Sequence, residues 1–341
     1  MTSAPLRLRL DGATLADNWR TLAAMSGGAA CGAAVKADGY GLGAVDVAKR
    51  LAAAGCRDFF VATWAEAAAL APLGLPVTVL HGVRDEDMAL ALTGIARPAL
   101  NTAHQVARWR AAGGGACDVM IDTGMNRLGL SVDDLPLLEG LVIETLMSHL
   151  ACADEDVAMN ERQRAAFAAL AGRTGAKRMS LANSAGIALG PDYAFDLTRP
   201  GLALYGGIPR GELGAIRQVA TPEAQILQRR TVPAGQTIGY NATWTAPMAT
   251  EVAVLNLGYA DGYFRGFSNT GAARLGGQVL PLLGRVSMDL IAIDVTAAPE
   301  LAEGDWLALD YALPEASARS GMSQYELLTS LGDRFDRLWS D

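Results

Sequence analysis

The chain has 341 residues, enough for one large domain or two ordinary ones, and 51% of them are hydrophobic while 19% are charged. This composition supports a sizeable core and excludes a long disordered stretch. The formal net charge is −8 without any cluster of lysine or arginine, which argues against nucleic acid and anionic membranes as partners.

In the first part of the chain, short apolar runs alternate with longer amphipathic ones. Eight of the short runs are predicted strands: 31–37, 58–63, 77–82, 97–101, 117–122, 142–149, 178–182 and 202–206. Helical segments are predicted between them, as over 45–55, 64–74 and 161–172. Strands that alternate with helices indicate a parallel sheet, and eight of them fit a (β/α)8 TIM-type barrel. An open doubly wound sheet is the alternative, although no GxGxxG fingerprint follows the first strand.

The pattern changes near residue 219, where β-like runs are separated by turns bearing glycine and proline. These runs are EAQILQRRTV, EVAVLNLGYA, GQVLPLLGRV and LIAIDVTA, and a helical pattern returns only near MSQYELLTSLG. We therefore predict a barrel domain over residues 8–218 and a mostly β domain over residues 219–341, which residues 1–7 could join.

The four cysteines, Cys31, Cys56, Cys117 and Cys152, are widely spaced and form no CxxC pair. We expect buried, reduced thiols rather than a disulfide framework or a zinc site. Three histidines are too few for a histidine-rich metal site, whereas a magnesium site made of carboxylates stays open. No run approaches the length of a membrane span, and the N-terminal segment lacks a long apolar region, so we predict a cytoplasmic protein.

Lys36 ends the first predicted strand, in the stretch AAVKADGYGLGA. Side chains at the carboxyl ends of barrel strands point into the mouth where active sites are built. A desolvated lysine there has a lowered pKa and can act as nucleophile or base, the alternative being a strand-end lysine that reaches into solvent. The glycines that follow allow the backbone to approach a phosphate, and Tyr40 offers a hydroxyl.

Further polar residues follow later predicted strands. Arg127, in IDTGMNRLG, could clamp a carboxylate, and His149 ends LMSH. Ser184 in LANSAG and the Gly201-Leu202 pair in TRPGLALYG belong to the seventh and eighth strands, the usual place of a phosphate site in a barrel. Ordinary structural roles are the alternatives: a solvated arginine, a satisfied histidine and a helix-capping serine. In the β region, Tyr259 and Met288 lie at predicted hairpin ends, and spacing alone does not bring them to the barrel.

Six motifs occur in one order along the chain: AAVKADGYG, DTGMNRLG, LANSAG, TRPGLALYG, LGYADGY and GRVSMD. Together they resemble alanine racemase, a pyridoxal-phosphate enzyme family with a barrel and a β domain. The resemblance implies that the protein interconverts L-alanine and D-alanine and provides D-alanine for peptidoglycan. A broader amino-acid racemase acting on serine is an alternative. A related decarboxylase would be expected to carry a late active-site cysteine, and none follows Cys152. A non-catalytic barrel protein that binds the cofactor would lack the β domain.

The same resemblance implies roles for the candidate residues. Lys36 would carry pyridoxal 5′-phosphate covalently and act as the base on the D-alanine side, while Tyr259 would be the base on the L-alanine side. His149 would polarise Tyr259 and lean on Arg199, which would face the pyridine nitrogen and leave it unprotonated. The phosphate would be held by Tyr40, Ser184, Gly201 and Leu202.

For the substrate, the resemblance implies that Arg127 and the backbone N–H of Met288 hold the carboxylate. Tyr259 and Met288 would act in trans, from the second subunit of a homodimer. Two positions depart from the family pattern. Met120 stands where many members have a carbamylated lysine that orients the arginine, so another group, such as bound chloride, would have to orient Arg127. Trp339 stands near the end of the chain where a phosphate-binding tyrosine is usual.

Overall fold

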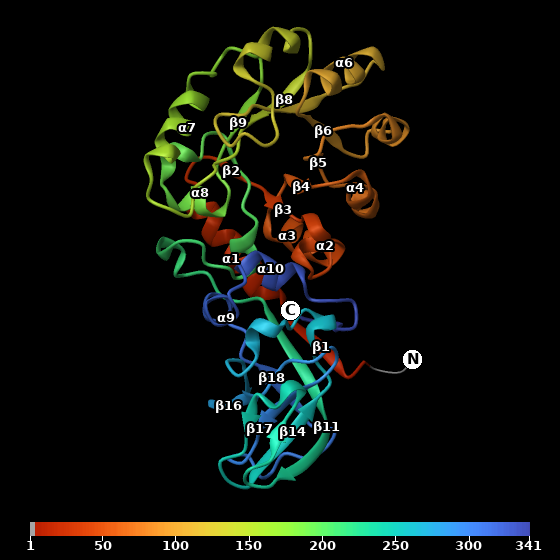
Figure 1. The fold of residues 1–341 in the computed structure, drawn as a ribbon. Coiled ribbons are helices and arrows are strands. Elements are labelled where there is room, and N and C mark those ends of the chain that lie inside the picture. Colours follow the sequence, from red (N-terminus) through yellow and green to blue (C-terminus); the bar gives the residue numbers. More distant parts are fainter. Residues whose placement is uncertain (1–3) are drawn as a thin grey trace. The chain divides into compact units, whose positions relative to one another are not determined.

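The computed structural model describes residues 4–341 (Figure 1). The chain forms two compact units: residues 14–217 make up one, and residues 218–341 with the described residues up to Ala13 make up the other. No helix in this described part of the chain is long and apolar enough to cross a membrane.

Parallel strands form the centre of the unit of residues 14–217. Seven of them pair in chain order: β3 (Ala33–Ala34), β4 (Phe59–Val61), β5 (Val77–Val79), β6 (Arg97–Leu100), β7 (Cys117–Met120), β8 (Ile143–Met147) and β9 (Arg178–Ser180). β2 (Ala30–Cys31), one residue before β3, pairs in parallel with β10 (Leu197–Thr198). The ring closes because the N–H of Arg199, just after β10, donates to the carbonyl of Ala182, just after β9, at 2.8 Å. The predicted (β/α)8 barrel is confirmed.

Helices follow the strands and lie outside them, as α3, α4, α6 and α7 show in Figure 1. The α-helices before residue 217 are α1 (Gly12–Met25), α2 (Lys36–Tyr40), α3 (Ala44–Ala54), α4 (Trp64–Leu70), α5 (Met88–Ala91), α6 (Ala103–Ala111), α7 (Ala158–Ala168) and α8 (Ser184–Ala188). The 3-10 helices are η1 (Ala71–Leu73), η2 (Asp85–Asp87), η3 (Val132–Leu138), η4 (Pro191–Tyr193), η5 (Leu202–Tyr205) and η6 (Gly211–Leu213). All three residues of β4 are buried, because helices cover one face of a barrel strand and the barrel interior covers the other.

The predicted eighth strand at 202–206 is wrong. That run forms the 3-10 helix η5, and the eighth strand is the earlier β10. Pro200 lacks an N–H group and ends the pairing. The apolar run is buried all the same, because Tyr205 stacks on Tyr40 and its hydroxyl donates to the carbonyl of Ala34 at 2.9 Å. A buried 3-10 turn and a buried strand therefore present the same short apolar pattern.

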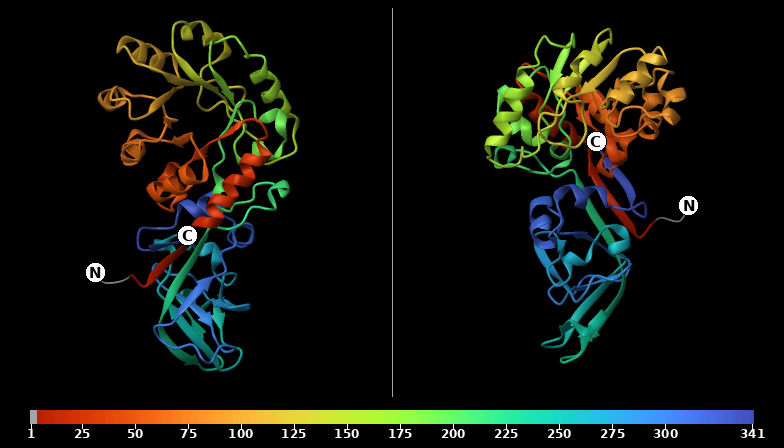
Figure 2. Two further views of the ribbon diagram at one scale, coloured as in Figure 1. Left: turned by 180° about the vertical axis from the view of Figure 1, so that it is seen from behind. Right: turned by 45° about the horizontal axis from the view of Figure 1, so that its top comes forward.

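The other unit is mostly β, as predicted. Its strands lie in the order β14 (Thr250–Leu255), β17 (Ile291–Asp294), β16 (Gln278–Leu283), β15 (Ala272–Leu275), β18 (Trp306–Leu309), β11 (Ala220–Val232), β1 (Leu6–Asp11) and β19 (Asp336–Ser340), and β14 also pairs with β11. β11 runs antiparallel to β1, as the green and red strands of Figure 2 show. A small hairpin joins β12 (Thr237–Ile238) to β13 (Trp244–Thr245).

Short helices complete this unit: η7 (Tyr240–Ala242), η8 (Tyr259–Asp261), η9 (Arg265–Phe267), α9 (Leu313–Ser320) and α10 (Gln324–Thr329). α10 corresponds to the predicted helical segment and begins at a capping box between Ser323 and Glu326. α9 was not predicted, although Pro314 in its first turn and Gly321 just after its end are typical helix boundaries.

Candidate active site

Lys36 stands at the carboxyl end of the first barrel strand, where the backbone turns sharply. The five residues Ala37–Gly41 all have positive φ, with values of 52, 52, 62, 56 and 84°. For residues other than glycine this left-handed conformation costs roughly 1–2 kcal/mol each. Such strain persists only where the surrounding structure enforces it, and it is typical of functional sites.

Two carboxylates hold this left-handed turn. Glu66, in the first turn of α4, accepts a hydrogen bond from the N–H of Ala37 at 2.7 Å. The same carboxylate caps α4 through the N–H groups of Ala62 and Thr63. Asp38 accepts from the N–H that begins α3, at 2.8 Å. The turn that carries Lys36 is thus tied to two neighbouring helices.

Tyr40, Ser184 and Gly201 converge beside this turn. A Cβ on Gly201 would lie 2.2 Å from the hydroxyl oxygen of Tyr40, so no side chain fits there. Ser184 Oγ accepts hydrogen bonds from the N–H groups of Gly201 and Ala203, at 2.9 and 3.1 Å. These two bonds occupy both lone pairs of the Ser184 oxygen. Its hydroxyl proton is not donated to any residue that the structure describes, so it is available to a ligand. Leu202 begins η5, so its N–H has no partner inside that helix. These donors form a cradle suited to an oxyanion such as phosphate.

Arg199 lies buried behind the cradle, with 6% of its surface exposed. Its guanidinium donates to the carbonyl of Ser148 at 2.6 Å and to the hydroxyl of Ser180. Burial, partly opposed by the charge of Asp118, lowers the pKa of Arg199 to about 10. Arg199 therefore stays protonated at neutral pH and remains a fixed donor.

His149 and Lys36 share the barrel mouth with two arginines. Burial, together with the charges of Arg199, Arg127 and Lys36, lowers the pKa of His149 to about 3, so its imidazole is neutral at physiological pH. The pKa of Lys36 is also lowered, first by burial and then by Arg127, while Glu66 opposes the shift. A mouth with this excess of basic groups attracts anionic ligands.

Arg127 is exposed, and it sits in a loop over 122–130 whose ends are fixed by backbone hydrogen bonds. The N–H of Asp122 donates to the carbonyl of Leu130, and the N–H of Leu130 donates to the carbonyl of Met120, both at 2.9 Å. The guanidinium of Arg127 makes no hydrogen bond or ion pair with any described residue. Met120 has a buried thioether that cannot be carbamylated, so it contributes only its backbone to this loop.

Tyr259 and Met288 belong to the other unit, where their two loops are joined directly. The N–H of Tyr259 donates to the carbonyl of Ser287, and the next N–H donates to the carbonyl of Met288, both at 3.0 Å. A Cβ on Gly258 would lie 2.2 Å from that Met288 carbonyl oxygen, so only glycine permits the approach. Arg265 lies over the Tyr259 ring, 5.3 Å from its centroid.

Arg334 is a further residue of these loops that the sequence motifs did not indicate. Its guanidinium pairs with Asp261 at 2.6 Å and with Asp289 at 2.8 Å, so it links the Tyr259 loop to the Met288 loop. Burial raises the pKa of Asp261, and Arg334 opposes that shift. Two aspartates in separate motifs were the only available signal. Trp339 lies in β19, where it pairs with Leu10.

The predicted residues of the barrel unit do gather at one rim. Lys36, Arg127, His149, Ser184 and Arg199 follow β3, β7, β8, β9 and β10, at the carboxyl ends where barrel enzymes place their catalytic groups.

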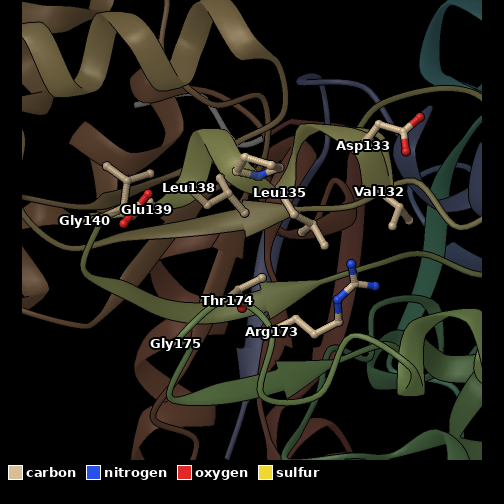
Figure 3. A pocket seen from close by; sticks show the side chains of 11 residues that line it. Val132, Asp133, Leu135, Leu138, Glu139, Gly140, Arg173, Thr174 and Gly175 are labelled. Carbon is tan, nitrogen blue, oxygen red and sulfur yellow. The ribbon is translucent and has the colours of Figure 1, made fainter.

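A hollow of about 750 Å³ lies elsewhere on this unit (Figure 3). It is lined by η3, by residues 139–141 before β8 and by residues 173–175 before β9, and none of the predicted site residues lines it. Because it faces the amino ends of the strands, we assign it no part in the chemistry.

Known proteins resemble this chain over its whole length. Residues 10–209 match the family model of the alanine racemase N-terminal domain, and residues 219–339 match that of the C-terminal domain. An alanine racemase of Acidiphilium cryptum is 43% identical, over 97% of this chain and 98% of that protein. The structure of alanine racemase from Bartonella henselae with covalently bound pyridoxal phosphate has a TM-score of 0.90 and 33% identity, covering 99% of this chain and 100% of that one. The structure of the biosynthetic alanine racemase from Pseudomonas aeruginosa has a TM-score of 0.90 and 31% identity, covering 100% of this chain and 100% of that one.

Proposed function

The chain belongs to the alanine racemase family, and we propose that it interconverts L-alanine and D-alanine with pyridoxal 5′-phosphate as its cofactor. One observation carries this proposal beyond family membership. The strained turn places Lys36 at the same barrel mouth as the oxyanion cradle of Tyr40, Ser184 and Gly201 and the buried donor Arg199.

The residues present fit this cofactor. The cradle offers the unpartnered Ser184 proton and the N–H of Leu202 to its phosphate, and Arg199 offers a donor to its pyridine nitrogen. Lys36 has a lowered pKa, which favours the neutral amine needed for covalent attachment. When bound, the cofactor supplies a sink for the electrons left on the α-carbon of alanine after its proton is removed.

The protein's own residues then have to move a proton on either face of that carbon. We assign the D-alanine side to the Lys36 amine and the L-alanine side to the Tyr259 hydroxyl. His149 is neutral at working pH, so it can exchange a hydrogen bond with Tyr259 without adding a charge, and Arg199 lies behind it. Arg127, which has no partner among the described residues, is free to bind the substrate carboxylate together with the N–H of Met288.

We further propose a homodimer in which Tyr259 and Met288 reach the barrel mouth of the partner subunit. The β unit exposes large apolar side chains near these loops: Tyr240, Met288 and Leu290. Exposed apolar groups of this size are typical of a surface that another chain covers. Mixing Lys36→Ala and Tyr259→Phe subunits tests the arrangement, since a hybrid dimer keeps one complete site. Recovered activity supports action in trans, and its absence in a confirmed hybrid contradicts it.

In the cell, we propose that the enzyme provides D-alanine for peptidoglycan in the cytoplasm. Its four cysteines are free thiols, which suits a reducing compartment.

Racemisation is tested directly with purified protein, pyridoxal phosphate and each enantiomer of alanine. We expect optical rotation to decay to zero from both starting enantiomers and Lys36→Ala to abolish the decay. Lys177→Ala is the matched control, because that lysine is exposed and pairs with Glu144 far from the mouth. Unchanged rotation with the parent protein would show that the proposed function is wrong.

A further inference from the structure

Gln163 is a buried polar residue in α7 that the proposed chemistry does not use. None of its surface is exposed. Its side-chain Nε2 donates to the carbonyl of His149 at 2.9 Å and to the hydroxyl of Thr123 at 3.3 Å, and its Oε1 accepts from the N–H of Ala151 at 2.8 Å. A single amide thus binds three groups from two loops of the barrel mouth.

These three contacts lie next to the candidate catalytic groups. Two of them flank His149 on its own strand end, so they determine the direction in which the chain leaves β8. The third reaches Thr123, at the start of the loop that carries Arg127. Thr123 in turn hydrogen-bonds the Ser148 hydroxyl at 2.7 Å, and the Ser148 carbonyl binds Arg199.

The barrel contains a similar amide away from these groups. Gln105, in α6, accepts from the N–H of Asn101 at 2.8 Å and donates to the carbonyl of His81 at 3.0 Å. It therefore joins the ends of β5 and β6 as Gln163 joins those of β7 and β8. Gln105 contacts none of the candidate site residues. A substitution of Gln105 therefore shows the general effect of losing an amide that joins two strand ends, without an effect on the site.

We infer that Gln163 is a positioning residue for the proposed racemisation, which fixes the backbone of His149 and the loop of Arg127 in one arrangement. This inference rests on the proposed function for its catalytic consequence. Its structural part does not, because the hydrogen bonds of Gln163 belong to the protein alone. Because the buried Gln163 amide has hydrogen-bond partners for both its nitrogen and its oxygen, it makes the arrangement rigid. Removal of the amide leaves the His149 carbonyl and the Ala151 N–H without these partners.

The test compares Gln163→Met with Gln105→Met. Methionine keeps the unbranched shape of glutamine but forms none of the hydrogen bonds of the amide. Gln163→Glu is the second variant, because it keeps an acceptor for Ala151 and loses both donors. The chain has only three histidines, so ¹⁵N-histidine labelling resolves His149 in the cofactor-free protein. We expect both Gln163 variants to shift the His149 imidazole signals and to lower kcat by about 10- to 100-fold, with KM little changed. Gln105→Met should leave both readouts at the parent values.

Unchanged His149 signals and parent kcat in a folded Gln163 variant would overturn the inference. So would an equal loss of kcat in Gln105→Met, because the effect would then come from loosening the rim in general. A parent protein that does not racemise alanine would instead contradict the proposed function, and the imidazole signals would still decide the positioning role.

Discussion

The carboxylate of Glu66 binds the backbone N–H of Ala37, the residue directly after Lys36, at 2.7 Å. Glu66 is also the carboxylate whose charge raises the pKa of Lys36 against the lowering effects of burial and Arg127. One side chain therefore both holds the left-handed turn and raises the basicity of the Lys36 amine that the turn presents.

We predict that Glu66→Gln lowers the pKa of Lys36 further, because the opposing negative charge is lost while burial and Arg127 remain. The chain has only three lysines, so reductive methylation with ¹³C-formaldehyde gives few signals, and the Lys36 signal can be titrated in the cofactor-free protein. Glu161→Gln is the matched control, since that glutamate pairs with Arg164 on the exposed face of α7. A Lys36 pKa that stays constant or rises in Glu66→Gln would contradict the prediction.

His149 should make the protein less stable in acid. Its folded-state pKa of about 3 lies below the ordinary value of 6.5, so between these two pH values the unfolded chain binds more protons than the folded one. The free energy of unfolding then rises with pH across this window, by up to about 1.4 kcal/mol per pH unit for one such group. Stability is lost as the pH falls from 6.5 towards 3.

The measurement is urea unfolding at several pH values for the parent and for His149→Asn. We expect the variant to show a shallower pH dependence in that window, because asparagine takes up no proton. His104→Asn should keep the parent slope, since His104 is an exposed residue of α6. Parallel curves for the parent and His149→Asn would show that His149 does not govern this acid sensitivity.

Gly201 should tolerate no side chain. A Cβ would lie 2.2 Å from the Tyr40 hydroxyl and 3.5 Å from Ala34, so Gly201→Ala must push Tyr40 out of the oxyanion cradle. We expect affinity for pyridoxal phosphate, measured by titration of the protein fluorescence, to fall by about tenfold or more, corresponding to the loss of one good hydrogen bond to a charged group. Gly115→Ala has open space around its Cβ and should bind as the parent does. Equal affinities would show that Tyr40 is not part of the cradle.

The sequence predicted the residues at the rim of the site better than the residues that hold them in place. Lys36 and His149 could be placed because parallel barrel strands bring their carboxyl ends to one rim, whichever strands they come from. Arg199 precedes the predicted strand at 202–206, so only the resemblance indicated it. Gln163 could not, because two of its three partners are backbone groups, which leave no trace in residue type. Glu66 belongs to a Thr63–Glu66 capping box, but residue type does not reveal that it also binds the N–H of Ala37. The predicted strand at 202–206 failed for a related reason, since five buried apolar residues do not reveal whether they form a strand or a 3-10 turn.

The β unit shows the same limit, since spacing gave no reason to place Tyr259 beside Met288. Their contact depends on backbone hydrogen bonds between the two loops and on Gly258, which has no Cβ to obstruct them. Arg334 lies still further along the chain, and only the folded sheet brings it to both aspartates.

Arg334 should therefore influence the L-alanine side of the reaction in particular. Arg334→Gln removes the cation that joins Asp261, two residues after Tyr259, to Asp289, next to Met288, and it leaves the buried Asp261 with an uncompensated charge. We expect loss of deuterium from α-deuterated L-alanine to slow by about 10- to 100-fold in single turnovers, and loss from D-alanine to slow much less.

Two comparisons sharpen this test. Tyr259→Phe removes the proposed L-side base itself, so it should show the same asymmetry more strongly than Arg334→Gln. Arg274→Gln breaks an ion pair with Asp310 of similar exposure in the same unit, which involves neither Asp261 nor Asp289, and it should leave both rates unchanged. If Arg334→Gln slows the two enantiomers equally, the arginine supports the unit as a whole and does not set the position of Tyr259.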